Sequence, residues 1–171
     1  MKFDIKITDK DMYRFYLYHT YHTFNGIISI VVGLFVFVVL YVVRDRLTPT
    51  DVILYIALGI ALLLYSPISL LTRSKAQVAS SKVLQNTLSY DFNDEGIRVT
   101  TEVEVNEGEA NSSLLPWNQL YKIVETKKQL LIYSGRMNAY VIPVEQLGEK
   151  KEELKEYIKE RTDDYRLSFR K

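Results

Sequence analysis

The chain has 171 residues, a formal net charge of +1 and no cysteine. Nucleic-acid-binding proteins usually present a basic face, so a charge this close to zero predicts that nucleic acid is not a partner. Without cysteine, the chain can form no disulfide, thiolate metal site or thiol nucleophile.

The N-terminal segment predicts a strand followed by an aromatic helix. Residues 2–8 alternate polar and apolar side chains, which is the period of a half-buried strand. Thr8, Asp9 and Asp11 then fit the start of a helix. The residues up to Phe24 are rich in aromatic rings, and tyrosines gather at membrane–water boundaries. These rings are expected to lie in a headgroup region or to pack against a folded domain, and both can hold.

Two uncharged apolar runs, residues 26–43 and 52–71, dominate the first half of the chain. Each is close to the ~20 residues that a helix needs to cross a bilayer. A chain in hydrocarbon must satisfy its backbone hydrogen bonds internally, so the two runs and their short polar connection predict a transmembrane helical hairpin. Pro67 predicts a kink. Gly26, Gly33 and Gly59 permit close helix approach, but no two of them have the GxxxG spacing.

Basic residues around the two runs predict the orientation of the hairpin, because cytoplasmic loops carry an excess of lysine and arginine. Such residues precede the first run and follow the second: Lys6, Lys10, Arg14, Arg73, Lys75 and Lys82. The connection carries Arg44 and Arg46, which favour the opposite orientation. We expect both termini in the cytoplasm. The first run is too long for a typical signal-peptide core and lacks a convincing cleavage site, so it is expected to be retained.

From residue 84 onward, the pattern becomes that of strands. Residues 84–92 and 97–105 alternate around a glycine-containing turn at 93–96 and predict a β-hairpin. An acidic loop is expected at 106–111. Further strands are expected at residues 112–115, 120–126, 129–134 and 139–144. Residues 149–161 have the apolar period of a helix, and the tail 162–171 is expected to fray.

The predicted fold class is α+β: a two-helix transmembrane hairpin plus an antiparallel β-barrel or sheet, capped by a C-terminal helix. Three segments are expected. Residues 1–24 form a strand and an interfacial helix, residues 25–83 form the hairpin and a stalk, and residues 84–171 form the folded domain. The strand at residues 2–8 could join the sheet across the hairpin.

Several motifs resemble those of the YcxB-like family of bacterial membrane proteins. They lie at residues 18–21 (YHTY), 90–97 (YDFNDEGI), 115–126 (LPWNQLYKIVET) and 142–143 (IP). The resemblance implies a cytoplasmic C-terminal domain similar to pleckstrin-homology-like barrels, on a two-helix anchor in a bacterial plasma membrane. The motifs are structural, so the resemblance implies no catalytic residues.

No residue constellation predicts catalysis, so neither enzymatic activity nor a cofactor is expected. The sequence has no GxSxG elbow and no glycine-rich phosphate loop. Asp91, Asp94 and Glu95 could act as paired carboxylates, but their place at a turn explains them. His19 and His22 could share a metal on one helix face, but no third ligand is close in sequence. We interpret them as polar residues among interfacial tyrosines, and no metal is expected.

The candidate binding residues form two groups. Trp117, Arg136 and Met137 could contact a protein partner, because tryptophan and arginine are enriched at binding hot spots. Trp117 could instead be a core aromatic whose indole N–H bonds to the backbone. Basic residues that could meet anionic headgroups are Arg73, Lys75, Lys82, Lys122, Lys127 and Lys128. Topology and solubility alone also account for them. The acidic stretch Glu102, Glu104, Glu107 and Glu109 should then face away from the lipid.

The sequence therefore predicts a membrane-anchored recognition module that binds a protein partner at the cytoplasmic face. The alternative is sensing of anionic lipid headgroups at the inner leaflet. A transporter is not favoured, because two uncharged spans enclose no polar path unless several copies assemble.

Overall fold

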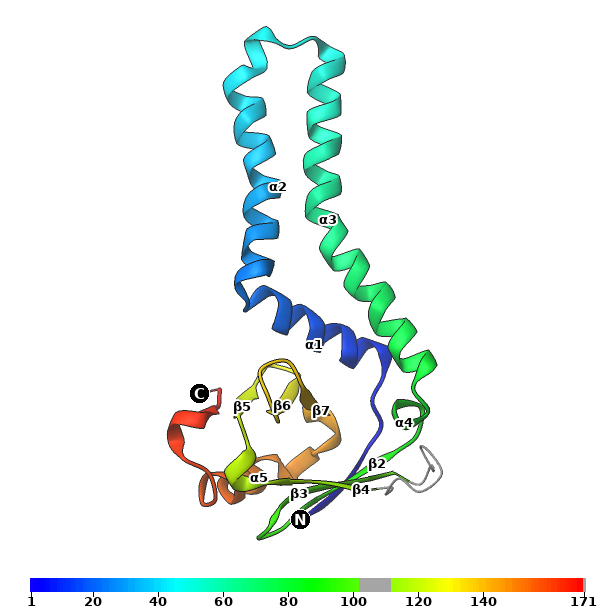
Figure 1. The fold of residues 1–171 in the computed structure, drawn as a ribbon, viewed down its shortest axis with the longest axis vertical. Helices are drawn as coiled ribbons and strands as arrows, with labels where there is room; N and C mark the ends of the chain where they lie inside the picture. Colours follow the sequence, from blue (N-terminus) through cyan, green and yellow to red (C-terminus); the bar gives the residue numbers. More distant parts are fainter. Residues whose placement is uncertain (102–111, 171) are drawn as a thin grey trace.

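The computed structural model describes residues 1–101 and 112–170. It has the α+β class expected from the sequence. A long helical hairpin stands on a small folded domain, and helix α1 (Asp9–Tyr21) lies across the base of the hairpin (Figure 1). Strands β1 (Lys2–Ile5) and β8 (Leu167–Ser168), which lie near the two ends of the described chain, both belong to the domain, so they lie on one side of the hairpin.

The first helix begins where the sequence predicts. Thr8 Oγ1 accepts the N–H of Asp11 at 3.3 Å, and the N–H of Thr8 donates to Asp11 Oδ2 at 3.0 Å. This reciprocal cap satisfies free donors at the helix start. Helix α1 ends at Tyr21 and does not continue into the first span. Thr23 Oγ1 donates to the carbonyl of Thr20 at 2.7 Å where the chain turns into helix α2 (Phe24–Val43).

The hairpin consists of α2 (Phe24–Val43), the short turn η1 (Arg44–Arg46) and α3 (Pro49–Ser80). Both helices are long and apolar enough to cross a membrane, and their apolar windows are almost entirely exposed on the protein. A core helix of a soluble protein would be buried, so this exposure favours a lipid surrounding.

The two helices pack closely where the sequence has glycine. A Cβ atom placed on Gly33 would lie 2.5 Å from Leu63 Cδ2, and one on Gly59 would lie 2.5 Å from Phe37 Cζ. Pro67 lies inside α3, and the part of α3 nearer the domain leans away from α2 (Figure 1). The predicted stalk is the end of this same helix, followed by α4 (Lys82–Gln85).

The first sheet has the order β1-β2-β3-β4 and is antiparallel. Its strands are β1 (Lys2–Ile5), β2 (Leu88–Phe92), β3 (Gly96–Thr101) and β4 (Ser112–Pro116). The predicted hairpin is confirmed up to Thr101, and the N-terminal strand joins the sheet across the membrane hairpin. The rest of the predicted second strand and the acidic residues at 102–109 lie outside the described residues.

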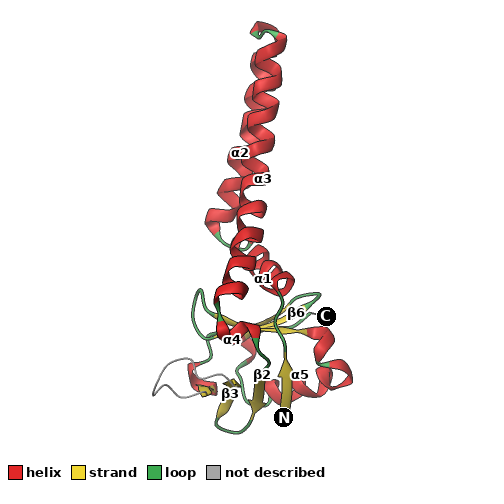
Figure 2. Cartoon of the chain, turned by 90° about the vertical axis from the view of Figure 1, so that its right-hand side faces the viewer, coloured by secondary structure: helices red, strands yellow, loops and turns green. Residues whose placement is uncertain are grey.

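The second sheet has the order β7-β6-β5-β8. Its strands are β5 (Lys122–Glu125), β6 (Gln129–Tyr133), β7 (Ala139–Pro143) and β8 (Leu167–Ser168). Short 3₁₀ turns connect the chain at η2 (Trp117–Gln119), η3 (Val144–Gln146), η4 (Gly148–Lys150) and η5 (Asp164–Arg166). The second sheet lies between α1 and the first sheet in the side view of Figure 2. Among the described residues the two sheets do not close into a barrel.

The C-terminal segment corrects one prediction. Helix α5 (Lys151–Lys159) forms as expected, but the tail does not fray: β8 pairs in parallel with β5. Arg166 Nη1 donates to the carbonyl of Leu120 at 2.9 Å, and the N–H of Arg170 donates to Glu125 Oε2 at 3.0 Å. These bonds hold the tail on an otherwise open sheet edge.

One hydrophobic core joins both sheets, α1 and α5. Its most buried apolar side chains include Ile5, Phe92, Ile97, Ile123, Leu131, Ile132, Ile142, Leu154 and Ile158. Met12 and Phe15 of α1 are 5% exposed and belong to the same core. The expectation that rings of this aromatic segment pack against the domain is therefore confirmed for Phe15.

Candidate functional site

A pocket of about 440 Å³ lies where α1, α3 and the β6–β7 turn meet. We call it the α1–α3 pocket; its lining is Phe15, Tyr16, His19, Thr20, Thr23, Leu70, Arg73, Arg136 and Met137. The first five come from α1 and its junction with α2, the next two from α3, and the last two from the turn after β6. Packing of α1 on the second sheet brings these three elements together.

The pocket lies at the ends of the two apolar helices. Thr23 directly precedes α2, Leu70 is near the end of the second apolar run, and Arg73 follows that run. If α2 and α3 span a bilayer, this level is the boundary between hydrocarbon and headgroups, where arginine and tyrosine are favoured.

Two arginines give the pocket a positive character. The guanidinium of Arg73 lies 5.0 Å from the ring centroid of Tyr16, a cation–π arrangement. Within residues 1–101 and 112–170, neither Arg73 nor Arg136 pairs with a carboxylate, and no acidic side chain lines the pocket. Arg14 and Arg161, by contrast, pair with Asp11 at 3.3 Å and with Asp94 at 2.9 Å. The pocket can therefore accept an anion from outside the chain.

His19 is a neutral member of this lining. Burial lowers its pKa, and the nearby charge of Lys122 lowers it further. The Nζ of Lys122 lies 4.8 Å from the ring centroid of Tyr133, and burial raises the pKa of Tyr133 to about 12. At neutral pH, His19 is thus an uncharged hydrogen-bonding group, and Tyr133 keeps its proton.

The two histidines do not form a metal site with each other. His22 stacks on Tyr18 with ring centroids 4.0 Å apart, and its Nδ1 lies 2.8 Å from the carbonyl oxygen of Tyr18. His19 instead contacts Phe15 and Tyr133. Among the described residues, no group of three His, Asp or Glu side chains could hold a metal ion.

Trp117 lies in a different pocket, of about 510 Å³, together with Arg161 and Arg166. Its Nε1 donates to the carbonyl of Asn93 at 2.9 Å, which confirms the bond to the backbone that one interpretation of this residue predicted. Both arginines are already engaged, Arg161 with Asp94 and Arg166 with main-chain carbonyls. The structure therefore separates Trp117 from Arg136 and Met137.

The acidic residues around the end of the β2–β3 hairpin have separate partners; Asp91 lies in β2, and Asp94 and Glu95 lie in the turn. Asp91 lies 3.8 Å from the N-terminal ammonium, Asp94 pairs with Arg161, and Glu95 lies 3.2 Å from Arg98 Nη2. The turn position expected from the sequence is thus found for Asp94 and Glu95, whereas Asp91 is a strand residue.

Of the six basic residues proposed to face lipid, only Arg73 lines the α1–α3 pocket. Lys122 lies over Tyr133, and Lys127 and Lys128 lie in the turn at the opposite end of β6. Lys75 is exposed on α3, and Lys82 starts α4. Arg136 is the residue that the sequence did not place with Arg73, because no local pattern joins the β6–β7 turn to the end of a membrane helix.

Comparison with known proteins gives one match. Residues 92–160 match the family model described as YcxB-like protein. No curated protein and no solved structure matches the chain. The likeness to pleckstrin-homology-like domains therefore stays a prediction. The matched segment runs from the end of β2 through α5 and contains the motifs at 115–126 and 142–143. Residues 92–160 are therefore similar to the YcxB-like family.

Proposed function

We propose that this protein is a membrane-anchored module that binds an anionic phospholipid headgroup in the α1–α3 pocket. The observation that carries the proposal is the pair Arg73 and Arg136, which line one pocket without a carboxylate partner among the described residues. Arginine presents a planar fork of N–H donors that suits phosphate oxygens.

The rest of the lining supports a headgroup ligand. Tyr16, His19 and Thr20 offer polar groups, while Leu70 and Met137 offer apolar contacts. Such a mixture fits the boundary between hydrocarbon and headgroups. Each basic residue close to an anionic leaflet contributes about 1 kcal/mol to membrane attraction. We propose a binding role rather than catalysis, and the proposal involves no cofactor.

The proposed setting is a bacterial plasma membrane with both termini in the cytoplasm. The placement of both chain ends on one side of the hairpin supports this topology (Figure 1), as does the excess of basic residues next to the domain-side ends of the spans. The cytoplasmic leaflet is rich in anionic lipid, which suits the two arginines.

Binding of a protein partner, the leading expectation from the sequence, has less support. Trp117 does not share a surface pocket with Arg136 and Met137, and its indole N–H is already bonded to Asn93. One feature that favours a partner is the side chain of Met137, which is 72% exposed.

The test uses the full chain in nanodiscs that contain equal amounts of phosphatidylglycerol and phosphatidylcholine. Native mass spectrometry counts the lipids that remain bound after release from the disc. We expect phosphatidylglycerol to be retained several-fold over phosphatidylcholine, and Arg73→Ala with Arg136→Ala to abolish that preference.

The matched control is Arg44→Ala with Arg46→Ala, which removes the same charge at the opposite end of the hairpin. This variant should keep the preference. Equal retention of the two lipids by the unmodified protein, or an unchanged preference in the Arg73/Arg136 variant, would contradict the proposal.

A further inference from the structure

We infer that the ligand of the α1–α3 pocket is a whole glycerophospholipid, one acyl chain of which lies in a groove on α3 while its phosphate meets Arg73 and Arg136. The inference rests on the proposed function and extends it, because it names the ligand as a membrane lipid and assigns a second part of the site.

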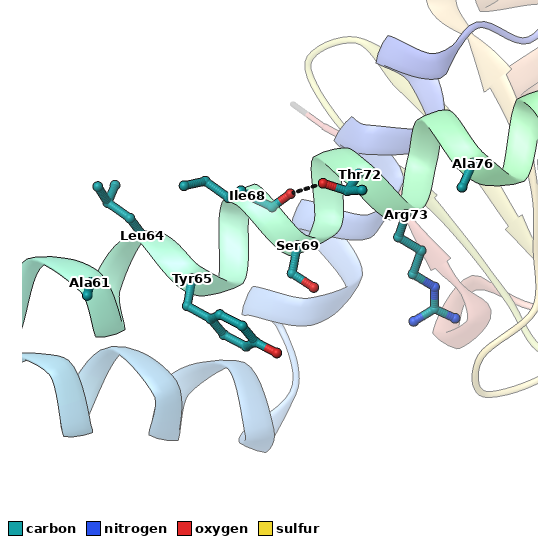
Figure 3. A pocket seen from close by; sticks show the side chains of 8 residues that line it. All are labelled: Ala61, Leu64, Tyr65, Ile68, Ser69, Thr72, Arg73 and Ala76. Atoms are coloured by element: carbon teal, nitrogen blue, oxygen red, sulfur yellow. Dashed lines mark hydrogen bonds between the residues drawn. The ribbon is translucent and has the colours of Figure 1, made fainter.

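The groove, here called the α3 groove, is a hollow of about 760 Å³ on the surface of α3 (Figure 3). Residues four apart lie on one face of a helix, and two such rows border the groove. One row is Leu64, Ile68 and Thr72, and the other is Tyr65, Ser69 and Arg73. Ala61 and Ala76, at its two ends, leave space because their side chains are small.

The groove is largely apolar; its polar groups are the hydroxyls of Tyr65, Ser69 and Thr72 and the guanidinium of Arg73. Thr72 Oγ1 donates to the carbonyl of Ile68 at 3.0 Å, so this hydroxyl is satisfied within the helix (Figure 3). Arg73 is the one charged side chain that lines the groove. An occupant therefore needs a long apolar part and an anionic group at one end.

Arg73 also belongs to the α1–α3 pocket, so the two hollows meet at this side chain. In Figure 3, Arg73 follows Tyr65 and Ser69 along the same side of α3. A single amphiphile can thus place its chain along Tyr65 and Ser69 and its phosphate at Arg73, with Arg136 across the pocket.

The part of the groove from Ala61 to Arg73, where the acyl chain would lie, fits one leaflet. Ala61 and Arg73 are separated by 12 residues (73 − 61), which is about 18 Å at a helical rise of 1.5 Å per residue. Half of a hydrocarbon core is about 15 Å. A helix from a second copy would be expected to cover α3 along its whole span. The lining instead ends at Ala61, roughly midway along the apolar run at 52–71.

The experiment uses the full chain in nanodiscs with photoreactive phosphatidylglycerol that carries a diazirine in its acyl chain. Phosphatidylcholine with the same label serves as the headgroup control. After illumination, mass spectrometry maps the labelled peptides. We expect labelling by phosphatidylglycerol to be concentrated on residues 61–76 and to exceed that by phosphatidylcholine several-fold there.

Ser69→Phe fills the groove next to Arg73 and should reduce this labelling several-fold. Ala57→Phe makes a similar change at an exposed position of α3 outside the groove and should leave it unchanged. Both variants must elute as the unmodified protein does. The Arg73→Ala/Arg136→Ala variant should lose the excess of phosphatidylglycerol labelling.

The outcomes separate the two proposals. Labelling spread evenly over α2 and α3, or unaffected by Ser69→Phe, would overturn the acyl-chain site while the headgroup preference could still stand. Crosslinks between copies at residues 61–76, or full displacement of the lipid by millimolar glycerol phosphate, would also overturn it. A labelling excess that persists without both arginines would overturn the headgroup site itself.

Discussion

The side-chain amide of Gln129 donates to the main-chain carbonyl of Asp11 at 2.7 Å, which ties the start of β6 to the first turn of α1. Gln129 is 1% exposed, so this bond lies in the core. The main-chain N–H of Gln129 donates to Thr126 Oγ1 at 3.0 Å. The helix that borders the proposed lipid site is thus held on the domain by a buried polar contact as well as by Met12 and Phe15.

Gln129→Met should lower the free energy of unfolding by about 1–3 kcal/mol, because it keeps the side-chain volume but removes the donor to a buried carbonyl. The measurement is the unfolding of the full chain in detergent. Gln119→Met at an exposed position is the control and should change stability by less than about 0.5 kcal/mol. Equal effects at the two positions would show that the bond to Asp11 is not stabilising.

Gly59→Ala should weaken the packing of the hairpin, because the new Cβ would lie 2.5 Å from Phe37 Cζ and force the ring to move. Overpacking of this kind costs about 1–3 kcal/mol. The readout is the thermal unfolding midpoint in detergent. Phe37→Leu in the same chain should restore part of the loss by removing the clashing ring atoms.

Gly135→Ala is a matched control for this substitution, since a Cβ at Gly135 would meet no atom within 4 Å. Its midpoint should stay close to that of the unmodified protein. A Gly59→Ala variant as stable as the Gly135→Ala variant would mean that α2 and α3 do not pack through Phe37.

Local patterns made most of the fold predictable. The helix cap formed by Thr8 and Asp11 depends only on neighbouring residues. The polar–apolar alternation of the strands and the length of the apolar runs are visible in short stretches of the sequence. The tail could not be predicted in this way. β8 has only Leu167 and Ser168, too few for a period, and its pairing depends on Arg166 reaching a carbonyl of Leu120.

The candidate site was predictable only in part. Arg73 was expected to face lipid because it follows an apolar run, and Arg136 was expected to face a protein partner. The two arginines share a pocket because α1 packs on the second sheet. This packing places the β6–β7 turn close to the domain-side end of α3. That arrangement depends on tertiary contacts such as Gln129 with Asp11, which leave no periodic signal in the sequence.

Glu125 should make the domain sensitive to acid. Burial alone would raise the pKa of this carboxyl, but hydrogen bonds from Lys151, Lys155 and the N–H of Arg170 outweigh burial and lower it. Lys151 Nζ and Lys155 Nζ lie 2.6 Å and 3.2 Å from its oxygens. A carboxyl whose pKa is lowered by folding stabilises the protein at pH values above its ordinary pKa of 4.5. This stabilisation is lost as the pH falls through the pKa of the folded state.

Glu125→Gln should therefore cost about 1–3 kcal/mol at pH 7 and flatten the decline of stability below about pH 5. Unfolding midpoints of the full chain between pH 7 and pH 3 give both quantities. Glu153→Gln, at an exposed position of α5, the helix that carries Lys151 and Lys155, should reproduce neither effect. A pH profile that keeps its slope in Glu125→Gln would assign the acid sensitivity to other carboxyls.

His19 provides a probe of the α1–α3 pocket. Burial first, and the charge of Lys122 second, lower its pKa below the ordinary value of 6.5. Because the folded state then binds fewer protons than the unfolded state, His19 should reduce stability as the pH falls below about 6.5. Lys122→Gln should move the pKa of His19 upward but not back to 6.5, since burial is the larger cause and remains.

The measurement is an NMR titration of the two histidine rings in the full chain in detergent, with His22→Gln used to assign the His19 signal. Lys128→Gln removes an equal charge at the far end of β6 and should leave the pKa of His19 almost unchanged. A pKa of His19 at or above 6.5 would show that the ring is not buried by the packing of α1. An equal response of this pKa to both lysine variants would show that the ring is not close to Lys122. Such a result would place the C-terminal turn of α1 away from β5, and the α1–α3 pocket would lose one of its walls.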